Sequence, residues 1–126
     1  MADKKRILVA DDDPDLLDLL KMDLTYQGYE VLVAADGKDA LQTALNETLD
    51  LILLDVMMPY IDGYHVAYEL TNKLGVKAPR IMIMTSRDTV KEKGIALMSG
   101  AAEVLQKPFE MAKLHERIAS ILAKPV

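Results

Sequence analysis

The chain has 126 residues, of which 51% are apolar, contains no cysteine and carries a formal net charge of −5. This length suits one domain over 1–126 with an ordinary core, and the lack of cysteine excludes disulfides, thiolate metal sites and a cysteine nucleophile. The negative charge argues against nucleic acid or an anionic membrane as a direct partner, and no apolar run suits a secretory signal or a bilayer span, so we expect a cytoplasmic domain.

Short apolar segments rich in β-branched residues alternate with amphipathic segments along the chain. Most of the apolar segments lack polar–apolar alternation, which is typical of strands buried on both faces of a parallel sheet. In chain order, the pattern predicts a strand over 6–10, a helix over 14–28, a strand over 29–34, a helix over 37–47, a strand over 49–54, a helix over 62–74, a strand over 80–84, a helix over 88–99, a strand over 102–106 and a helix over 109–123.

Local signals mark several of these helix ends. Asp13 is placed as the N-cap of the first helix and Pro14 as its first residue, while Gly28, Gly75 and Gly100 mark the ends of three helices. Five strand–helix alternations favour a doubly wound α/β fold with right-handed crossovers.

Polar residues follow four of the five expected strands, at the edge where open α/β sheets bind ligands. They are Asp11, Asp12, Asp13, Asp55, Thr85, Ser86 and Lys107, and Pro108 follows the lysine directly. Each is common as a cap or loop residue, but their arrival at one sheet edge is not expected by chance. Clustered carboxylates favour a hard divalent ion, Mg²⁺ or Mn²⁺, while a lysine and a hydroxyl can bind phosphoryl oxygens.

The carboxylates of this set divide by expected role. A carboxylate can accept a phosphoryl group as an acyl phosphate, and Asp55 is the candidate nucleophile; the strand order that the resemblance described below implies puts its strand at the centre of the sheet. A metal ion would relieve the repulsion between Asp11 and Asp12, which we expect to be its ligands. Asp13 needs no metal, because capping the first helix explains it.

The motifs ILVADDDP, LILLDVMMPYIDGY, IMIMTS and GAAEVLQKPF resemble the receiver (response-regulator) domain of two-component signalling, in the chemotaxis-regulator-like family. The resemblance covers about residues 5–122, the expected core of a single receiver domain. It implies a flavodoxin-like fold, with five helices around a five-stranded parallel sheet of strand order 2-1-3-4-5.

The resemblance also assigns the metal site. It implies that Asp55 is the phosphorylated residue and that Asp12 binds Mg²⁺ directly, with Asp11 acting through water. The backbone carbonyl of Met57 is the implied third protein ligand.

Four further residues receive roles from the same resemblance. Lys107 is expected to pair with a phosphoryl oxygen, and Thr85 to move and hydrogen-bond the phosphoryl group with help from the backbone N–H of Ser86. The peptide bond before Pro108 is expected to be cis.

The sequence departs from the family pattern at the switch. The family often has Tyr or Phe three residues before the lysine, a side chain that swings inward when the threonine moves, whereas this chain has Val104. The output face formed by the fourth helix, fifth strand and fifth helix is therefore expected to respond less, or by another route.

A second feature concerns the lifetime of the phosphoryl group. Met57 lies two residues after Asp55, and Arg87 lies two residues after Thr85, at positions that in the family border the path of the hydrolytic water. We expect these side chains to shield the acyl phosphate and slow self-dephosphorylation.

These features predict a phosphorylation-controlled switch rather than a turnover enzyme. The expected donor is a sensor histidine kinase or a His-phosphotransfer protein, and the expected receiver of the signal is an output partner or domain. Two alternatives remain open: a haloacid-dehalogenase-like phosphatase with an Asp nucleophile, and an interaction module that is not phosphorylated. Phosphatases of this kind begin with a D-x-D motif after a strand. Asp11-x-Asp13 matches that motif only superficially, because Asp15 stands where Thr or Val is expected.

Other polar residues are expected to be structural. His65 and His115 lie on helices away from the strand ends and are expected at the surface. The run Lys91-Glu92-Lys93 is expected to form a solvated face of the fourth helix, although that face often meets partners in the family.

Overall fold

The computed structural model describes residues 4–124 and contains a five-stranded parallel sheet with the order β2-β1-β3-β4-β5. The strands are β1 (Arg6–Ala10), β2 (Glu30–Ala34), β3 (Leu51–Asp55), β4 (Arg80–Thr85) and β5 (Glu103–Gln106). The helices are α1 (Pro14–Tyr26), α2 (Gly37–Asn46), α3 (Gly63–Leu74), α4 (Thr89–Met98) and α5 (Met111–Ala123), with a short 3-10 helix, η1 (Gly75–Lys77). The predicted fold class and strand order are confirmed.

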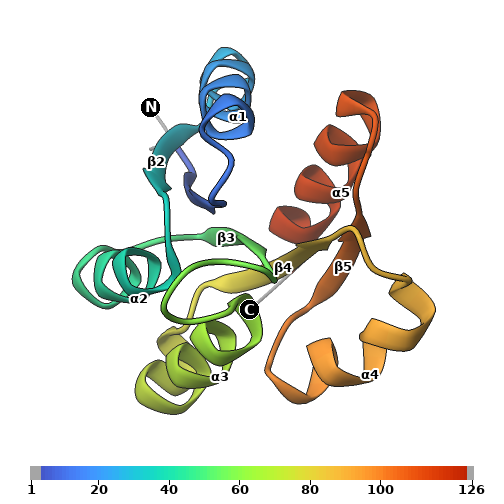
Figure 1. Ribbon diagram of the computed structural model, residues 1–126. Coiled ribbons are helices and arrows are strands. Elements are labelled where there is room, and N and C mark those ends of the chain that lie inside the picture. Colours follow the sequence, from blue (N-terminus) through green and yellow to red (C-terminus); the bar gives the residue numbers. More distant parts are fainter. Residues whose placement is uncertain (1–3, 125–126) are drawn as a thin grey trace.

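Helices cover both faces of the sheet. Figure 1 shows α1 and α5 on one face and α2, α3 and α4 on the other. Alternate residues of the central strand β3 serve the two sides: Ile52 and Leu54 pack in the core under α2 and α3, whereas Leu51 and Leu53 pack under α1 and α5. This burial on both faces explains why the strand reads as an uninterrupted apolar run.

Aspartate side chains start four of the helices. Asp13 Oδ1 accepts hydrogen bonds from the backbone N–H groups of Asp15 at 3.0 Å and Leu16 at 3.4 Å, as its position before Pro14 predicts. The N-caps of the next three helices are Asp36, Asp62 and Asp88. Each cap satisfies a backbone donor at the start of its helix, which fixes where the loops of the sheet edge end.

The start of α3 packs directly on the end of β3. The backbone N–H of Gly63 donates to the carbonyl of Val56 at 3.0 Å, and a Cβ at position 63 would lie 2.3 Å from the backbone oxygen of Asp55. Only glycine allows this approach, so Gly63 helps to set the position of Asp55. None of the helices in residues 4–124 combines the length and apolar character that a membrane crossing requires.

Candidate functional site

The polar residues singled out from the sequence lie together at the carboxyl edge of the sheet. Asp55 ends β3 opposite Met84 of β4, and Thr85 ends β4 opposite Gln106 of β5. The backbone N–H of Lys107 donates to the carbonyl of Thr85 at 2.7 Å, which holds the loop after β5 against the end of β4. Parallel register therefore delivers groups from distant parts of the sequence to one place.

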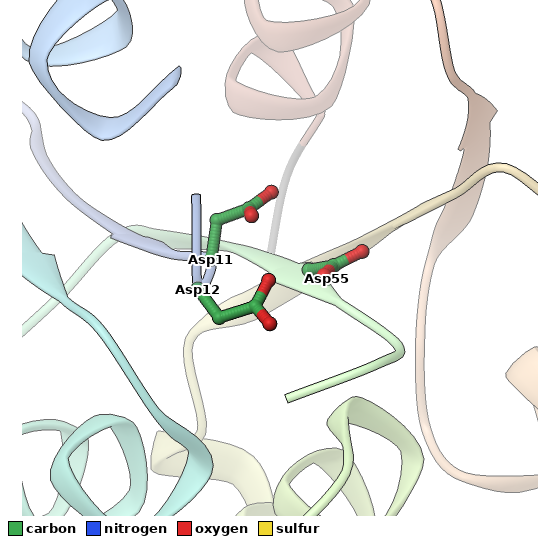
Figure 2. A group of neighbouring side chains, drawn as sticks. All are labelled: Asp11, Asp12 and Asp55. Atoms are coloured by element: carbon green, nitrogen blue, oxygen red, sulfur yellow. The ribbon is translucent and has the colours of Figure 1, made fainter. Parts of the chain in front are cut away.

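Three carboxylates converge at this edge. Asp11 and Asp12 come from the loop after β1, and each offers an oxygen that lies, with one from Asp55, within a group spanning no more than 4.8 Å. Figure 2 shows the three side chains next to one another at this edge. Asp11 and Asp55 are buried, whereas Asp12 is exposed. A set of carboxylate oxygens, with one exposed member, suits a hard divalent cation.

Lys107 joins the two buried carboxylates. Its Nζ lies 2.5 Å from Asp11 Oδ2 and 3.2 Å from Asp55 Oδ1. Burial alone would lower the pKa of Lys107, but the hydrogen bond and charge of Asp11, with a smaller effect from Asp55, outweigh it and raise that pKa. The ammonium group is therefore held in its charged form, and the peptide bond from Lys107 to Pro108 is cis, as expected.

The same surroundings raise the pKa of Asp55. Burial is the largest cause and the negative charge of Asp11 is the next, while Lys107 acts in the opposite direction. One ammonium group therefore does not fully compensate the carboxylates. A divalent cation bound by Asp11, Asp12 and Asp55 would supply the missing positive charge, so the donor set fits the predicted metal ion.

Thr85 and Ser86 lie at the end of β4 in different surroundings. Thr85 is buried, and its Oγ1 accepts a hydrogen bond from the backbone N–H of Arg87 at 3.0 Å. Ser86 is exposed. A hydroxyl can accept and donate hydrogen bonds at the same time, so Thr85 Oγ1 can accept from Arg87 and still donate its O–H to a ligand.

Sequence reasoning missed a polar cluster beside the site. Arg87 Nη2 lies 3.3 Å from Met57 Sδ, and Arg87 Nη1 lies 3.6 Å from Glu92 Oε1. Glu92 also accepts a hydrogen bond from the Tyr64 hydroxyl at 2.8 Å. The prediction of a solvated run was wrong for Glu92, which is only 8% exposed, and right for Lys91 and Lys93. Glu92 precedes the buried Ala96 by four residues, a spacing that places both on one helix face and could have revealed its burial.

The two histidines lie away from this edge. His65 is exposed on α3, with Nε2 3.7 Å from Glu69 Oε1. His115 of α5 is half-buried rather than at the open surface, and its Nε2 lies 2.5 Å from Asp23 Oδ2 of α1. This pair links the two helices that cover one face of the sheet, so the expectation of a surface residue was wrong for His115.

Comparison with known proteins places this geometry in a family. The model of the response regulator receiver domain matches residues 7–119. Over 119 residues the chain is 41% identical to the uncharacterized transcriptional regulatory protein YrkP of Bacillus subtilis, covering 94% of this chain and 50% of that protein. Over 120 residues it is 38% identical to the alkaline phosphatase synthesis transcriptional regulatory protein PhoP of the same organism, covering 95% and 49%. The chain thus spans about half the length of these curated relatives.

Solved structures agree with the sequence comparison. A putative response regulator from Chloroflexus aurantiacus superposes with a TM-score of 0.88 at 33% identity, covering 97% of this chain and 100% of that one. The response regulator TrrA from Thermotoga maritima, in complex with Mg(2+)-BeF, gives a TM-score of 0.82 at 34% identity, covering 93% and 98%. The chain belongs to the response regulator receiver domain family of two-component systems.

Proposed function

We propose that the chain is one receiver domain, with a core of about residues 5–122, that acts as a phosphorylation-controlled switch. A sensor histidine kinase or a His-phosphotransfer protein donates the phosphoryl group to Asp55 in the presence of Mg²⁺ or Mn²⁺. The observation that carries this proposal is the grouping of three carboxylates within 4.8 Å, with Lys107 paired to the two buried ones. The TrrA structure with Mg(2+)-BeF, similar to this chain, supports it.

The transfer exchanges one bond for another. An oxygen of Asp55 bonds to phosphorus while the bond between phosphorus and the donor imidazole nitrogen breaks, and the imidazole keeps the electron pair and takes up a proton. Asp11, Asp12, Asp55 and the Met57 backbone carbonyl would hold a divalent ion, which would supply positive charge to the phosphoryl oxygens.

Lys107, Thr85 and Ser86 then bind the group that has been added. Lys107 Nζ is already 3.2 Å from Asp55 Oδ1, so it can pair with a phosphoryl oxygen on that residue after a small movement. The Thr85 hydroxyl and the backbone N–H of Ser86 offer further donors at the same edge. The phosphoryl group adds a charge of about −1.5 to −2, which these donors must compensate locally.

Met57 and Arg87 set the lifetime of the acyl phosphate in this proposal. Their side chains meet at 3.3 Å beside the site, which supports a role in keeping water away from Asp55. Replacing both, Met57→Asn with Arg87→Glu, is expected to speed loss of the phosphoryl group by about tenfold or more, because an attacking water gains access and polar support. The measurement is decay of labelled protein after removal of the donor, and an unchanged rate would contradict the role.

The output surface is the face formed by α4, β5 and α5. A change at Thr85 reaches α4 through the loop that contains Arg87, because the Arg87 backbone binds the Thr85 hydroxyl. The relatives are named as transcriptional regulators and are about twice as long as this chain, which supports an output domain or partner as the recipient of the signal.

The deciding experiment is incubation with Mg²⁺ and a small phosphodonor such as acetyl phosphate. We expect one stable, hydroxylamine-labile phosphoryl group on Asp55, found by mass spectrometry and absent in Asp55→Asn. Rapid turnover of a small phosphate ester would instead favour the phosphatase alternative. No incorporation from a small donor or from a phosphorylated kinase would favour a module that only binds partners.

A further inference from the structure

α4 carries a buried carboxylate with two partners from other elements. Glu92 accepts a hydrogen bond from Tyr64 of α3 at 2.8 Å and forms an ion pair with Arg87 of the loop after β4 at 3.6 Å. A carboxylate as buried as this one is costly unless it is paired, so these contacts maintain the position of α4. The burial of Tyr64 and its bond to Glu92 raise the pKa of the Tyr64 hydroxyl.

Arg87 is shared between Glu92 and the phosphorylation site. Its backbone N–H donates to Thr85 Oγ1 at 3.0 Å, and its guanidinium lies 3.3 Å from Met57 Sδ. Within residues 4–124, the cation paired with Asp55 is Lys107, so the Arg87 guanidinium is engaged elsewhere. The Arg87 side chain is 53% exposed, which leaves it room to change partner.

We propose that Glu92 is a positioning residue that competes with a phosphoryl group on Asp55 for the Arg87 guanidinium, an inference that rests on the proposed phosphorylation. A guanidinium binds phosphate oxygens through paired charge-assisted hydrogen bonds, which a single carboxylate at 3.6 Å does not match. Arg87 can bind the phosphoryl group only after its ion pair with Glu92 is broken. The free energy of that ion pair therefore disfavours the phosphorylated state.

When Arg87 turns from Glu92 to the phosphoryl group, Tyr64 is the partner of Glu92 that remains among the described residues. The contacts that hold α4 against α3 and the loop after β4 are then weaker. The helix is suited to respond, because Gly94 lies in its interior and a Cβ there would meet nothing within 4 Å. Glycine without a packing reason lowers helix stability. This route carries the signal from Asp55 to α4 without an aromatic side chain at Val104.

The test uses beryllium fluoride with Mg²⁺ as a stable phosphoryl mimic and measures its affinity by calorimetry. Glu92→Gln keeps the shape and the acceptor for Tyr64 but removes the charge that holds Arg87. We expect it to bind the mimic about three- to fivefold more tightly than the wild type, the size of one partly exposed ion pair. Glu116→Gln, at an exposed position on α5, is the control and is expected to match the wild type.

A second variant changes the affinity in the opposite direction. Tyr64→Phe removes the hydrogen bond to Glu92, so the buried carboxylate depends more strongly on Arg87. We expect Tyr64→Phe to bind beryllium fluoride more weakly than the wild type. A merely structural role for the cluster would shift both variants the same way, and that result would overturn the inference.

A double-mutant cycle separates competition for Arg87 from a general charge effect. In the Arg87→Gln background, Glu92→Gln is expected to leave the affinity for beryllium fluoride unchanged. An equal gain in both backgrounds, or no gain in either, would refute the inference while leaving the proposed function intact. A wild-type protein that binds no beryllium fluoride at Asp55 would instead refute the proposed function, and the inference with it.

Discussion

Lys107 determines much of the charge balance at the sheet edge. Its ammonium group contacts Asp11 and Asp55, and Asp12 adds a third carboxylate to the same space. Desolvated charges that are only partly compensated reduce the stability of a fold. Removing a single charge from this group therefore has an effect whose sign depends on which charge is removed.

Asp55→Asn is expected to stabilise the protein at neutral pH in the absence of divalent ions. The raised pKa of Asp55 means that the folded state holds this proton more tightly than the unfolded state does. The contribution of Asp55 to folding stability is therefore fully present below its ordinary pKa of 3.8 and is lost as pH rises through the raised pKa of the folded state. The variant avoids this loss and should gain about 1 kcal/mol in urea unfolding at pH 7 with chelator. Asp18→Asn, at an exposed position on α1, is the control. An Asp55→Asn protein that is less stable than the wild type would contradict the proposed repulsion between the carboxylates.

Lys107→Met is expected to have the opposite effect. Methionine preserves most of the apolar stem, but Asp11 then remains fully buried without its cation. Leaving a buried charge unpaired should cost about 2–3 kcal/mol in unfolding free energy without metal. Added Mg²⁺ should recover part of this loss, and a Lys113→Met variant on the exposed side of α5 should show little change.

The residue roles could be predicted from sequence only where local position decides them. The position of Asp13 before Pro14 predicts a cap, and the structure has that cap. The pairing of Lys107 with Asp11 joins residues 96 positions apart, and no local pattern specifies it. The charged run around Glu92 does not reveal its burial, because successive residues of a helix point in different directions.

At the scale of elements, α4 carries a glycine, Gly94, in its interior. Its interior glycine contrasts with Gly63, where the backbone of β3 leaves no room for a side chain. Gly94→Ala should raise the unfolding free energy by about 1 kcal/mol and slow amide exchange within α4, because alanine favours the helix and meets no neighbour. Gly63→Ala, the matched substitution at a crowded site, should destabilise the protein. A Gly94→Ala variant with faster exchange in α4 would contradict this account.

Element boundaries were predictable to within a residue or two from strand composition, aspartate caps and glycine stops. The predicted fourth helix, 88–99, compares with Thr89–Met98 in the structure. The remaining difference arises because residues that cap a helix belong to it only in part, so a pattern of residues cannot define the last position.

At the scale of the whole molecule, alternation of strands and helices was sufficient to predict a doubly wound sheet. This alternation does not predict the strand order, because the residues of a crossover do not specify on which side of the first strand the next strand is added. The order 2-1-3-4-5 came from the family resemblance, and the structure confirms it. The meeting of Asp11, Asp12 and Asp55 depends on that order, because β1 and β3 must be neighbours.

Metal binding should be visible in the stability of the entire fold. Mg²⁺ at millimolar concentration is expected to raise the melting temperature of the wild type by a few degrees, since a ligand that binds only the folded state stabilises it. Asp12→Ala should lose most of this increase while remaining folded without metal, because Asp12 is exposed. Circular dichroism melts with and without chelator measure the difference, and an equal increase in Asp12→Ala would exclude this residue as a ligand.

The crowded carboxylates at the sheet edge also constrain how this protein can evolve. Replacing Asp55 by a neutral residue is expected to stabilise the fold and, under the proposed function, to remove the residue that is phosphorylated. A laboratory selection for heat resistance alone would therefore enrich variants that no longer signal. Only a screen that also requires signalling would keep Asp11, Asp12 and Asp55 together. The three acidic side chains at this edge are therefore expected to persist only where selection acts on signalling as well as on stability.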